Sequence, residues 1–332
     1  MILSCGDALI DFMPVKSEDG RDAYVPGVGG SCLNVAVAIA RLGAPAGLVG
    51  GISTDLFGRM IADHARHSTV DLRYVVRSAA ATTLAFVRFV EGEPHYVFYD
   101  EGTAAQRWVY QRGSIAFNSI DALHLGSTTL INDLASAQVL AAVDDARGAT
   151  TISFDPNCRP QLIHDKVSYV RRIDAFARRA DIVRMSEVDF AFLYGAQEHE
   201  RKAMALIADG ATLVVITRGE QSVLAWHRAT GLVEVTAPRV DIVDTIGAGD
   251  TFQGALLVAL REIRRIGVEA LTAITVDELR RALTFAVTCS AISCSRIGAD
   301  PPRRAELRPD LIGSLLGGDL PSAAPADKRA SC

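Results

Sequence analysis

Residues 244–257 read DTIGAGDTFQGALL, in which the turn Gly247–Gly249 stands directly before an aspartate and an amphipathic run. The apolar positions after Asp250 recur with helical spacing, so the sequence predicts a helix that begins at about Asp250. The residues before the turn, PRVDIVDT (238–245), are predicted as a strand. Glycines let a ligand approach the backbone closely, and the first N–H groups of a helix favour negative charge. The stretch is therefore predicted to hold a transferring phosphoryl group.

The sequence allows two interpretations of Asp250. Aspartate is among the preferred N-cap residues of helices, so its role could be purely structural. Alternatively, the helix start lowers the pKa of its carboxyl group, which keeps Asp250 ionised at neutral pH and able to take a proton from a hydroxyl group.

Short apolar strand patterns alternate with helical patterns along most of the chain, as in DALHLG (121–126) followed by NDLASAQVLAAVDDAR (132–147). This order predicts an α/β fold whose mostly parallel central sheet is covered by helices on both faces. Two segments, Phe12–Gly30 and Thr82–Gly102, break the alternation and are predicted as hairpins that form a small β-lid; an ordinary edge hairpin is the alternative. Residues 1–316 are predicted to form one domain and 317–332 a flexible tail.

Composition excludes several classes of function. The net charge of -5 and the scattered basic residues argue against nucleic-acid binding. The N-terminal stretch has no basic leader and no apolar run is long enough for a membrane span, so a cytoplasmic protein with reduced thiols is expected. None of the four lysines follows a glycine, which excludes a P-loop, and no H-R-D triplet occurs.

Polar residues follow several of the predicted strands. Because the carboxyl ends of parallel strands form the ligand-binding edge of such sheets, these residues are predicted to converge on one cleft. They are Asp11, Asn157, Arg159, Ser186, Asp189, Thr217, Gly219 and Asp250.

The sequence resembles the ribokinase-like (PfkB) carbohydrate kinases over residues 1–312. DTIGAGDTFQGAL is similar to the C-terminal signature of that family, and GGSCLNVAVAIARLG (29–43) with GGISTDLFG (50–58) is similar to the N-terminal one. The resemblance implies a three-layer sandwich fold with a small β-lid, and ATP and Mg²⁺ as cofactors. It implies that Asp250 is the base, that Gly247, Ala248 and Gly249 form the anion hole, that Asp11, Gly30 and Asn34 contact the sugar, and that Thr217 and Gly219 form the turn on the nucleotide side.

The same resemblance implies a loop for a monovalent cation, K⁺, beside the anion hole, formed by Asp244, Ile246, Ser293, Arg296 and Gly298. Where many members carry N-x-x-E near Mg²⁺, this chain has Ser186, Glu187, Val188 and Asp189, so either acid is open as the residue that holds the metal through water. Val287 stands where an Asn or His often meets the adenine, and Pro302 where a Ser often closes the cation loop.

The stretches FDPNCRP (154–160) and FYDEGTAA (98–105) resemble the fructokinase branch and, more loosely, the 2-keto-3-deoxygluconate kinases. Asn157, Arg159 and Tyr99 are accordingly expected at the sugar. Asp100 and Glu101 after Tyr99 would repel a carboxylate ligand, which favours a neutral ketohexose, with fructose expected first. An acid sugar, another neutral sugar, a nucleoside, and a sensor that binds sugar without turnover remain alternatives, and two chains are expected to associate through the lid.

Overall fold

The computed structural model describes residues 1–90, 93–195 and 198–317. Within these residues the main sheet has nine strands in the order β13-β12-β11-β10-β9-β8-β1-β4-β5, and its neighbours from β5 to β11 are parallel. Its strands are β1 (Ile2–Cys5), β4 (Ala46–Ser53), β5 (Val75–Ser78), β8 (Ala122–Gly126), β9 (Thr151–Asp155), β10 (Ile182–Ser186), β11 (Leu213–Thr217), β12 (Ser222–His227) and β13 (Gly231–Thr236). Only β11-β12-β13 at one edge pair antiparallel.

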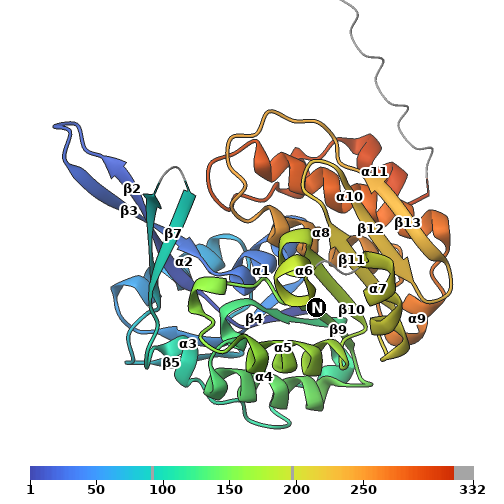
Figure 1. Cartoon of the computed structure of the whole chain (residues 1–332), viewed down its shortest axis with the longest axis horizontal. Helices are drawn as coiled ribbons and strands as arrows, with labels where there is room; N and C mark the ends of the chain where they lie inside the picture. The colour runs from blue at the N-terminus through green and yellow to red at the C-terminus, as the bar shows by residue number, and fades with distance from the viewer. Residues whose placement is uncertain (91–92, 196–197, 318–332) are drawn as a thin grey trace, which may run out of the picture.

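Helices cover both faces of this sheet (Figure 1). Successive strand residues face opposite sides, so Leu48 joins one hydrophobic cluster and Val49 the other. The first cluster packs against α1 (Ser31–Arg41), α2 (Leu56–His67), α8 (Ala248–Glu262), α9 (Val268–Thr272), α10 (Val276–Cys294) and α11 (Pro309–Leu315). The second packs against α4 (Asp133–Ala146), α5 (Lys166–Ala177), α6 (Glu187–Tyr194) and α7 (His199–Ala208), and the short α3 (Ala104–Arg107) contacts β4. The predicted three-layer α/β fold is confirmed.

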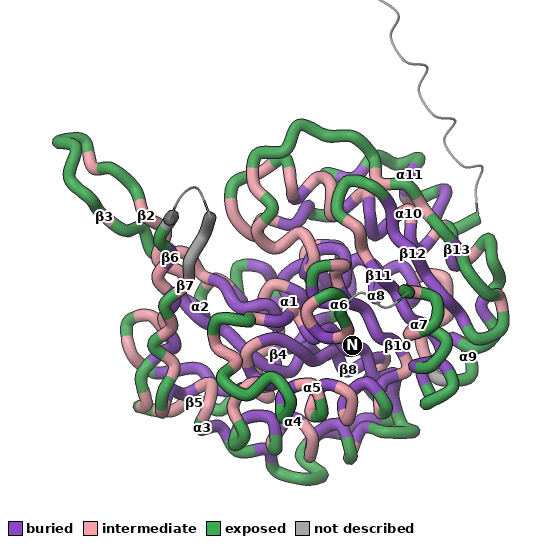
Figure 2. Tube along the Cα trace, in the orientation of Figure 1, coloured by how far each residue is buried: buried purple, intermediate pink, exposed green. Residues whose placement is uncertain are grey.

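Short 3-10 helices complete the described elements: η1 (Phe117–Ser119), η2 (Ser127–Leu130), η3 (Pro160–Leu162) and η4 (Arg304–Glu306). The strands from β4 to β12 in the sheet order are almost entirely buried, as Figure 2 shows, whereas the edge strands β5 and β13 are partly exposed. In the part of the chain that the structure describes, no helix is long and apolar enough to cross a membrane.

A second sheet of four strands forms the lid and confirms that prediction. Its order is β3-β2-β6-β7, with β2 (Leu9–Lys16), β3 (Asp22–Gly29), β6 (Leu84–Val90) and β7 (Glu93–Tyr99). The two hairpins project from the body of the molecule next to α2 (Figure 1). On one side of the lid, Phe12 stacks on Phe86 with ring centroids 4.5 Å apart.

Two sequence-based predictions of local structure are wrong. Residues 238–245 form no strand; the N–H groups of Val243 and Asp244 instead donate to the carbonyl oxygen of Cys294 at the end of α10. The apolar residues that suggested a strand, Val240, Ile242 and Val243, are 40%, 46% and 58% exposed, so they have no buried sheet face to fill. In addition, Asp11 lies within lid strand β2 and does not follow a strand of the main sheet.

The boundary between domain and tail is not tested. Helix α11 ends at Leu315, and residues 318–332 of the predicted tail lie outside the described residues.

Candidate active site

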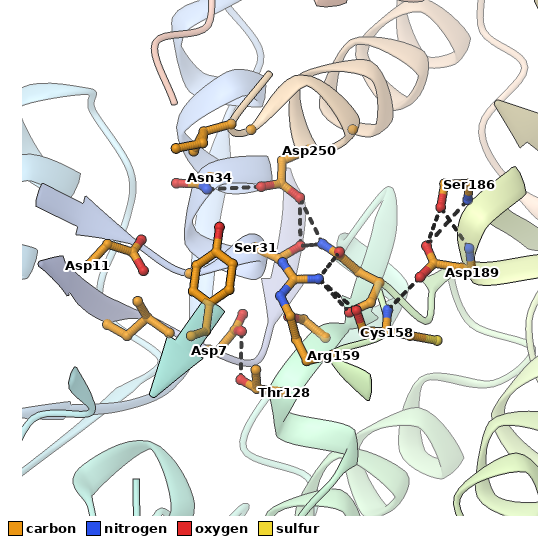
Figure 3. Close-up of a pocket in the computed structure, with 18 of the residues that line it drawn as sticks. Asp7, Asp11, Ser31, Asn34, Thr128, Cys158, Arg159, Ser186, Asp189 and Asp250 are labelled. Atoms are coloured by element: carbon orange, nitrogen blue, oxygen red, sulfur yellow. Dashed lines mark hydrogen bonds between the residues drawn. The ribbon is translucent and has the colours of Figure 1, made fainter. Parts of the chain in front are cut away.

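A cavity of about 460 Å³ lies between the lid and the carboxyl ends of the parallel strands (Figure 3). Most of the polar residues predicted to converge line it. They come from β2, the segment after β9, the end of β10, the start of α6 and the start of α8: Asp11, Asn157, Arg159, Ser186, Asp189 and Asp250. Thr217 and Gly219 are not among its lining residues.

The carboxylate of Asp250 is buried in this cavity and points away from its own helix. One oxygen, Oδ1, accepts hydrogen bonds from the hydroxyl of Ser31 at 2.6 Å and from Nδ2 of Asn157 at 3.3 Å. The other, Oδ2, accepts from Nδ2 of Asn34 at 2.9 Å. Helix α8 begins at Ala248 with Gly247 as its N-cap, two residues earlier than expected, so the N-cap interpretation of Asp250 is wrong.

The pKa of Asp250 also differs from the sequence-based expectation. Burial raises it, while the hydrogen bonds from Ser31 and Asn34 and the charge of Arg159 act in the opposite direction. The helix start was expected to lower this pKa. The ionised carboxylate loses more hydration free energy on burial, however, than the helix terminus gives back as electrostatic stabilisation. A raised pKa makes the carboxylate a stronger base.

The loop before Asp250 packs closely against neighbouring residues. Gly247 has φ 73°, and a Cβ there would come within 2.6 Å of the Cβ of Ala299. A Cβ on Gly249 would lie 2.9 Å from Nη1 of Arg184. The N–H groups of the first helical turn have no carbonyl partner within the helix, so the loop presents donors to the cavity at Gly249 and Asp250.

Arg184 is a buried cation beside this loop that sequence analysis missed. It is 5% exposed, its Nη1 donates to Oδ2 of Asp155 at 2.5 Å, and its Nη2 donates to Oγ1 of Thr217 at 2.7 Å. Its Nε has no partner among the described residues. The available signal was an arginine inside the apolar strand run ADIVRM, because such a charge is rarely buried without a purpose.

The lid contributes a second acidic group, Asp11. Burial raises the pKa of its carboxyl group to about 6; Arg159 lowers this pKa, and the negative charges of Asp7 and Asp250 raise it. Asp7, which sequence analysis did not single out, lines the same cavity and accepts from the N–H of Cys32 at 2.9 Å and from Oγ1 of Thr128 at 2.8 Å. The side of the cavity under the lid is therefore rich in hydrogen-bond acceptors.

Tyr99 is not in the cavity. It is 62% exposed, and ring contacts place it beside Phe86 on the outer side of the lid. Tyr96 and Phe98 line the cavity in its place, because alternate residues of β7 face opposite sides. Asp100 accepts a hydrogen bond from Nε2 of Gln106 and lines a smaller neighbouring cavity.

The structure separates the two acids of the 186–189 segment. Asp189 lines the cavity, accepts from the N–H of Cys158 at 2.9 Å, and forms a capping box with Ser186 at the start of α6. Burial raises its pKa. Glu187 points elsewhere, with Oε1 3.7 Å from Nε2 of His199, so it is not a cavity residue.

The residues of the predicted cation loop are near one another, with one exception. Asp244 accepts from the N–H groups of Ile246 and Gly298 at 3.0 and 2.8 Å. Ser293, beside Cys294 whose carbonyl oxygen accepts from the N–H groups of Val243 and Asp244, is buried, and its hydroxyl has no partner among the described residues. The side chain of Arg296 instead pairs with Asp300 and Glu306.

The remaining predicted nucleotide residues lie outside the cavity. Thr217 ends β11 and contacts Arg184, Gly219 lies in the turn before β12 with φ 55°, and Val287 is buried in the packing around α10. Gly30 and Asn34 line the cavity as expected, and Gly30 is the N-cap of α1. Within the described residues, no group of three or more His, Cys, Asp or Glu side chains is arranged to hold a metal ion.

A lid over the strand ends and a buried carboxylate at a helix N-terminus define a kinase of the ribokinase-like fold. Residues 1–305 match the pfkB family carbohydrate kinases, and the chain belongs to this family. The fructokinase of Rhizobium leguminosarum bv. trifolii is 36% identical over 261 residues, which are 79% of this chain and 80% of that protein. Fructokinase-1 of Oryza sativa subsp. japonica is 35% identical over 315 residues, covering 92% of this chain and 95% of that protein.

A solved structure also resembles this chain. The fructokinase of Xylella fastidiosa with bound ATP matches with a TM-score of 0.84 at 27% identity, covering 95% of this chain and 97% of that chain.

Proposed function

We propose that this chain is a fructokinase that transfers the γ-phosphoryl group of ATP to the 6-hydroxyl of fructose, giving fructose 6-phosphate and ADP. The observation that carries the proposal is the position of Asp250, a buried carboxylate next to the N–H groups that open α8. Relatives named fructokinases, each aligned over more than three quarters of this chain, support fructose as the acceptor.

The reaction follows from this arrangement. The 6-hydroxyl donates its hydrogen bond to Asp250, its oxygen forms the new bond to the γ-phosphorus, and the proton passes to the carboxylate. The bond from phosphorus to the β–γ bridging oxygen breaks, and its electron pair leaves with ADP. The loop Gly247–Gly249 forms the anion hole: the N–H of Ala248 donates to the carbonyl oxygen of Thr245, so the N–H groups of Gly249 and Asp250 are the donors for the phosphoryl group. The guanidinium of Arg184 adds positive charge beside Gly249.

Asp189 fits a role in holding Mg²⁺ through water. It lines the cavity, and each of its oxygens already accepts a bond from the protein, so a metal-bound water is a better ligand for it than direct coordination. When bound, Mg²⁺ neutralises charge on the phosphates of ATP. For K⁺ we propose the loop around Asp244, which accepts from the N–H groups of Ile246 and Gly298, next to the buried and unpartnered hydroxyl of Ser293 in the described part of the chain.

A neutral sugar fits the lid side of the cavity better than an acid sugar. Asp11 and Asp7 line this side, so a ligand carboxylate would face two acids, whereas Asp100 lies in the adjoining small cavity and is bonded to Gln106. The same acceptors suit sugar hydroxyl groups. A 2-keto-3-deoxygluconate kinase is therefore not favoured.

The test is a panel of sugars with ATP and Mg²⁺, with ADP release as the readout. Fructose is expected to give the highest kcat/KM, with 2-keto-3-deoxygluconate, ribose and nucleosides at least about tenfold lower, the discrimination that one or two poorly paired polar groups produce. Running the panel in potassium and in choline salts tests the cation loop, and sedimentation of the same sample tests association through the lid. If no sugar leads to ADP release, the proposed kinase activity is wrong and a sensor that binds sugar without turnover is the remaining function.

Asp11 gives this enzyme an expected loss of sugar affinity in acid. The ionised carboxylate accepts hydrogen bonds from sugar hydroxyl groups, and its pKa is raised to about 6, so protonation begins to remove the acceptor as the pH falls through 6. Fructose affinity should fall up to about tenfold between pH 7 and pH 5, since about a tenth of the carboxylate stays ionised one unit below its pKa. Calorimetric titration at several pH values measures this.

The matched variant for that experiment is Asp11→Asn. It should bind fructose more weakly at pH 7 but without the fall in acid, because its amide does not titrate. A wild-type affinity that is constant from pH 7 to pH 5 would exclude Asp11 as the titrating contact.

A further inference from the structure

Ser31 is the shortest hydrogen-bond contact of the proposed base. Its hydroxyl lies 2.6 Å from Oδ1 of Asp250, and both side chains are buried. The single hydrogen of a serine hydroxyl can serve one acceptor, and here a carboxylate is that acceptor. The hydroxyl oxygen in turn accepts from Nδ2 of Asn157 at 2.7 Å.

These contacts continue to Arg159. Its Nη1 donates to Oδ1 of Asn157 at 2.5 Å, so a chain of hydrogen bonds runs from Arg159 through Asn157 and Ser31 to Asp250. Asn157 has φ 37°, a left-handed conformation that is uncommon for residues other than glycine. Such strain is retained where the surrounding contacts fix the backbone, and here it directs the amide of Asn157 towards Ser31 and Asp250.

These hydrogen bonds leave the two carboxylate oxygens of Asp250 with unequal numbers of partners. A carboxylate has about four lone-pair positions, two on each oxygen. Ser31 and Asn157 occupy both positions of Oδ1, whereas among the described residues Oδ2 accepts a side-chain hydrogen bond from Asn34 alone. One position on Oδ2 therefore remains for a substrate hydroxyl.

We propose that Ser31 is a positioning residue for phosphoryl transfer: it holds Oδ1 of Asp250 so that Oδ2 accepts the proton of the sugar hydroxyl, and it connects the base to Arg159 and Asn157. This inference rests on the proposed kinase function and adds a residue to it. The proton balance is that of the transfer itself, since the hydroxyl loses its proton to Oδ2 as its oxygen bonds to phosphorus. Ser31 keeps its own proton throughout.

The location of Ser31 makes this contact rigid. It is the first residue of α1, directly after Gly30, and a Cβ on Gly30 would come within 2.8 Å of Ala8 Cα and Asp7 O, so the start of the helix is fixed against the β1–β2 connection. Alanine at position 31 keeps the helix and removes only the hydroxyl oxygen.

The test is Ser31→Ala, with kcat and fructose KM measured across pH. The hydrogen bond stabilises the ionised carboxylate, so its loss raises the pKa of Asp250, and the acid limb of kcat should move up by about one pH unit. At neutral pH kcat should fall about tenfold, while KM stays within about threefold, because Ser31 acts on the base and not on the bound sugar. Asn157 can shorten its own bond to Oδ1 and so limits the loss.

Other charged or titratable groups around Asp250 stay in place in this variant. They are Asp155 at the end of β9, Arg159 after it, Asp11 on β2, Arg184 on β10 and Cys32 on α1. A shift of the acid limb therefore reports the hydroxyl.

Two further variants complete the test. Ser31→Thr keeps the hydroxyl and should restore kcat and the acid limb. Ser136→Ala removes another buried serine, whose hydroxyl donates to the carbonyl oxygen of Asp133 within α4, away from the cavity, and should change neither. Thermal unfolding of all three checks folding.

The outcomes distinguish a failure of the proposed Ser31 role from a failure of the proposed kinase function. A Ser31→Ala enzyme with kcat within twofold of wild type, or with reduced kcat but an unmoved acid limb, overturns the positioning role. If the wild type prefers another sugar, the comparison is made on that sugar and still decides Ser31. A wild type that phosphorylates none overturns the kinase instead.

Discussion

Replacing Asp250 with asparagine is expected to lower kcat by roughly 10² to 10⁴, the usual cost of losing a positioned general base. An amide cannot take the proton of the 6-hydroxyl, whereas Ser31 and Asn34 would still hold a side chain of the same size. Fructose affinity should stay within a few-fold, since Asp11 and Arg159 remain. Steady-state rates and calorimetric affinity on one preparation measure both.

The asparagine must also fit its neighbours. Oδ1 can still accept from Ser31, but the new Nδ2 would face Nδ2 of Asn34, so Asn34 must rotate its amide to present oxygen. Stability should not fall, because Asp250 does not cap α8 and burial of its charge opposes folding. A thermal scan checks this.

Asp181→Asn is a matched control for that experiment. Burial raises the pKa of Asp181 as well, but its carboxylate accepts from the N–H of Ile152 at the opposite end of the strands. Its kcat should remain within about twofold of wild type, as for substitutions away from a reacting group. If Asp250→Asn matches this control, Asp250 is not the base.

The fold could be predicted largely from the alternation of strand and helix patterns. Buried parallel strands such as β4 and β11 are continuous apolar runs, and the helices between them carry a clear apolar face. The same criterion failed for residues 238–245, where apolar residues alternate but remain exposed. Pattern alone does not reveal whether a sheet edge is free to accept another strand, and here the segment pairs with the end of α10.

The site was predictable where a residue follows a strand directly, as Asn157 and Asp189 do. It was not predictable where one residue of register decides the side of a strand, and Tyr99 and Tyr96 of β7 are the example. The pKa of Asp250 could not be read from its helix position either, because burial against α1 and the segment after β9 is a tertiary property.

The role of Arg184 could not be predicted from the sequence either, since a single arginine in a strand pattern does not reveal which residues surround it. Its buried pair with Asp155 joins β9 and β10 directly beneath the loop of Gly249. Arg184 is a partner for a buried acid, and we propose that it also supplies charge for the transferring phosphoryl group. A single substitution would disturb both, because an unpaired buried Asp155 costs about 3 to 5 kcal/mol.

The informative experiment is therefore Arg184→Met in combination with Asp155→Asn, compared with Asp155→Asn alone. The double variant removes the positive charge without leaving a buried carboxylate unpaired, and its kcat should fall roughly 10² to 10³, the cost of losing one group that stabilises transition-state charge. Asp155→Asn alone keeps the guanidinium, with its bond to Thr217, and should retain kcat within about fivefold. Urea unfolding of both variants separates folding from catalysis, and fructose affinity should be unchanged because Arg184 lies on the anion-hole side of the cavity. A double variant that folds normally and keeps the kcat of Asp155→Asn would show that Arg184 only joins two strands, and the anion hole would then depend on the N–H groups of α8 alone.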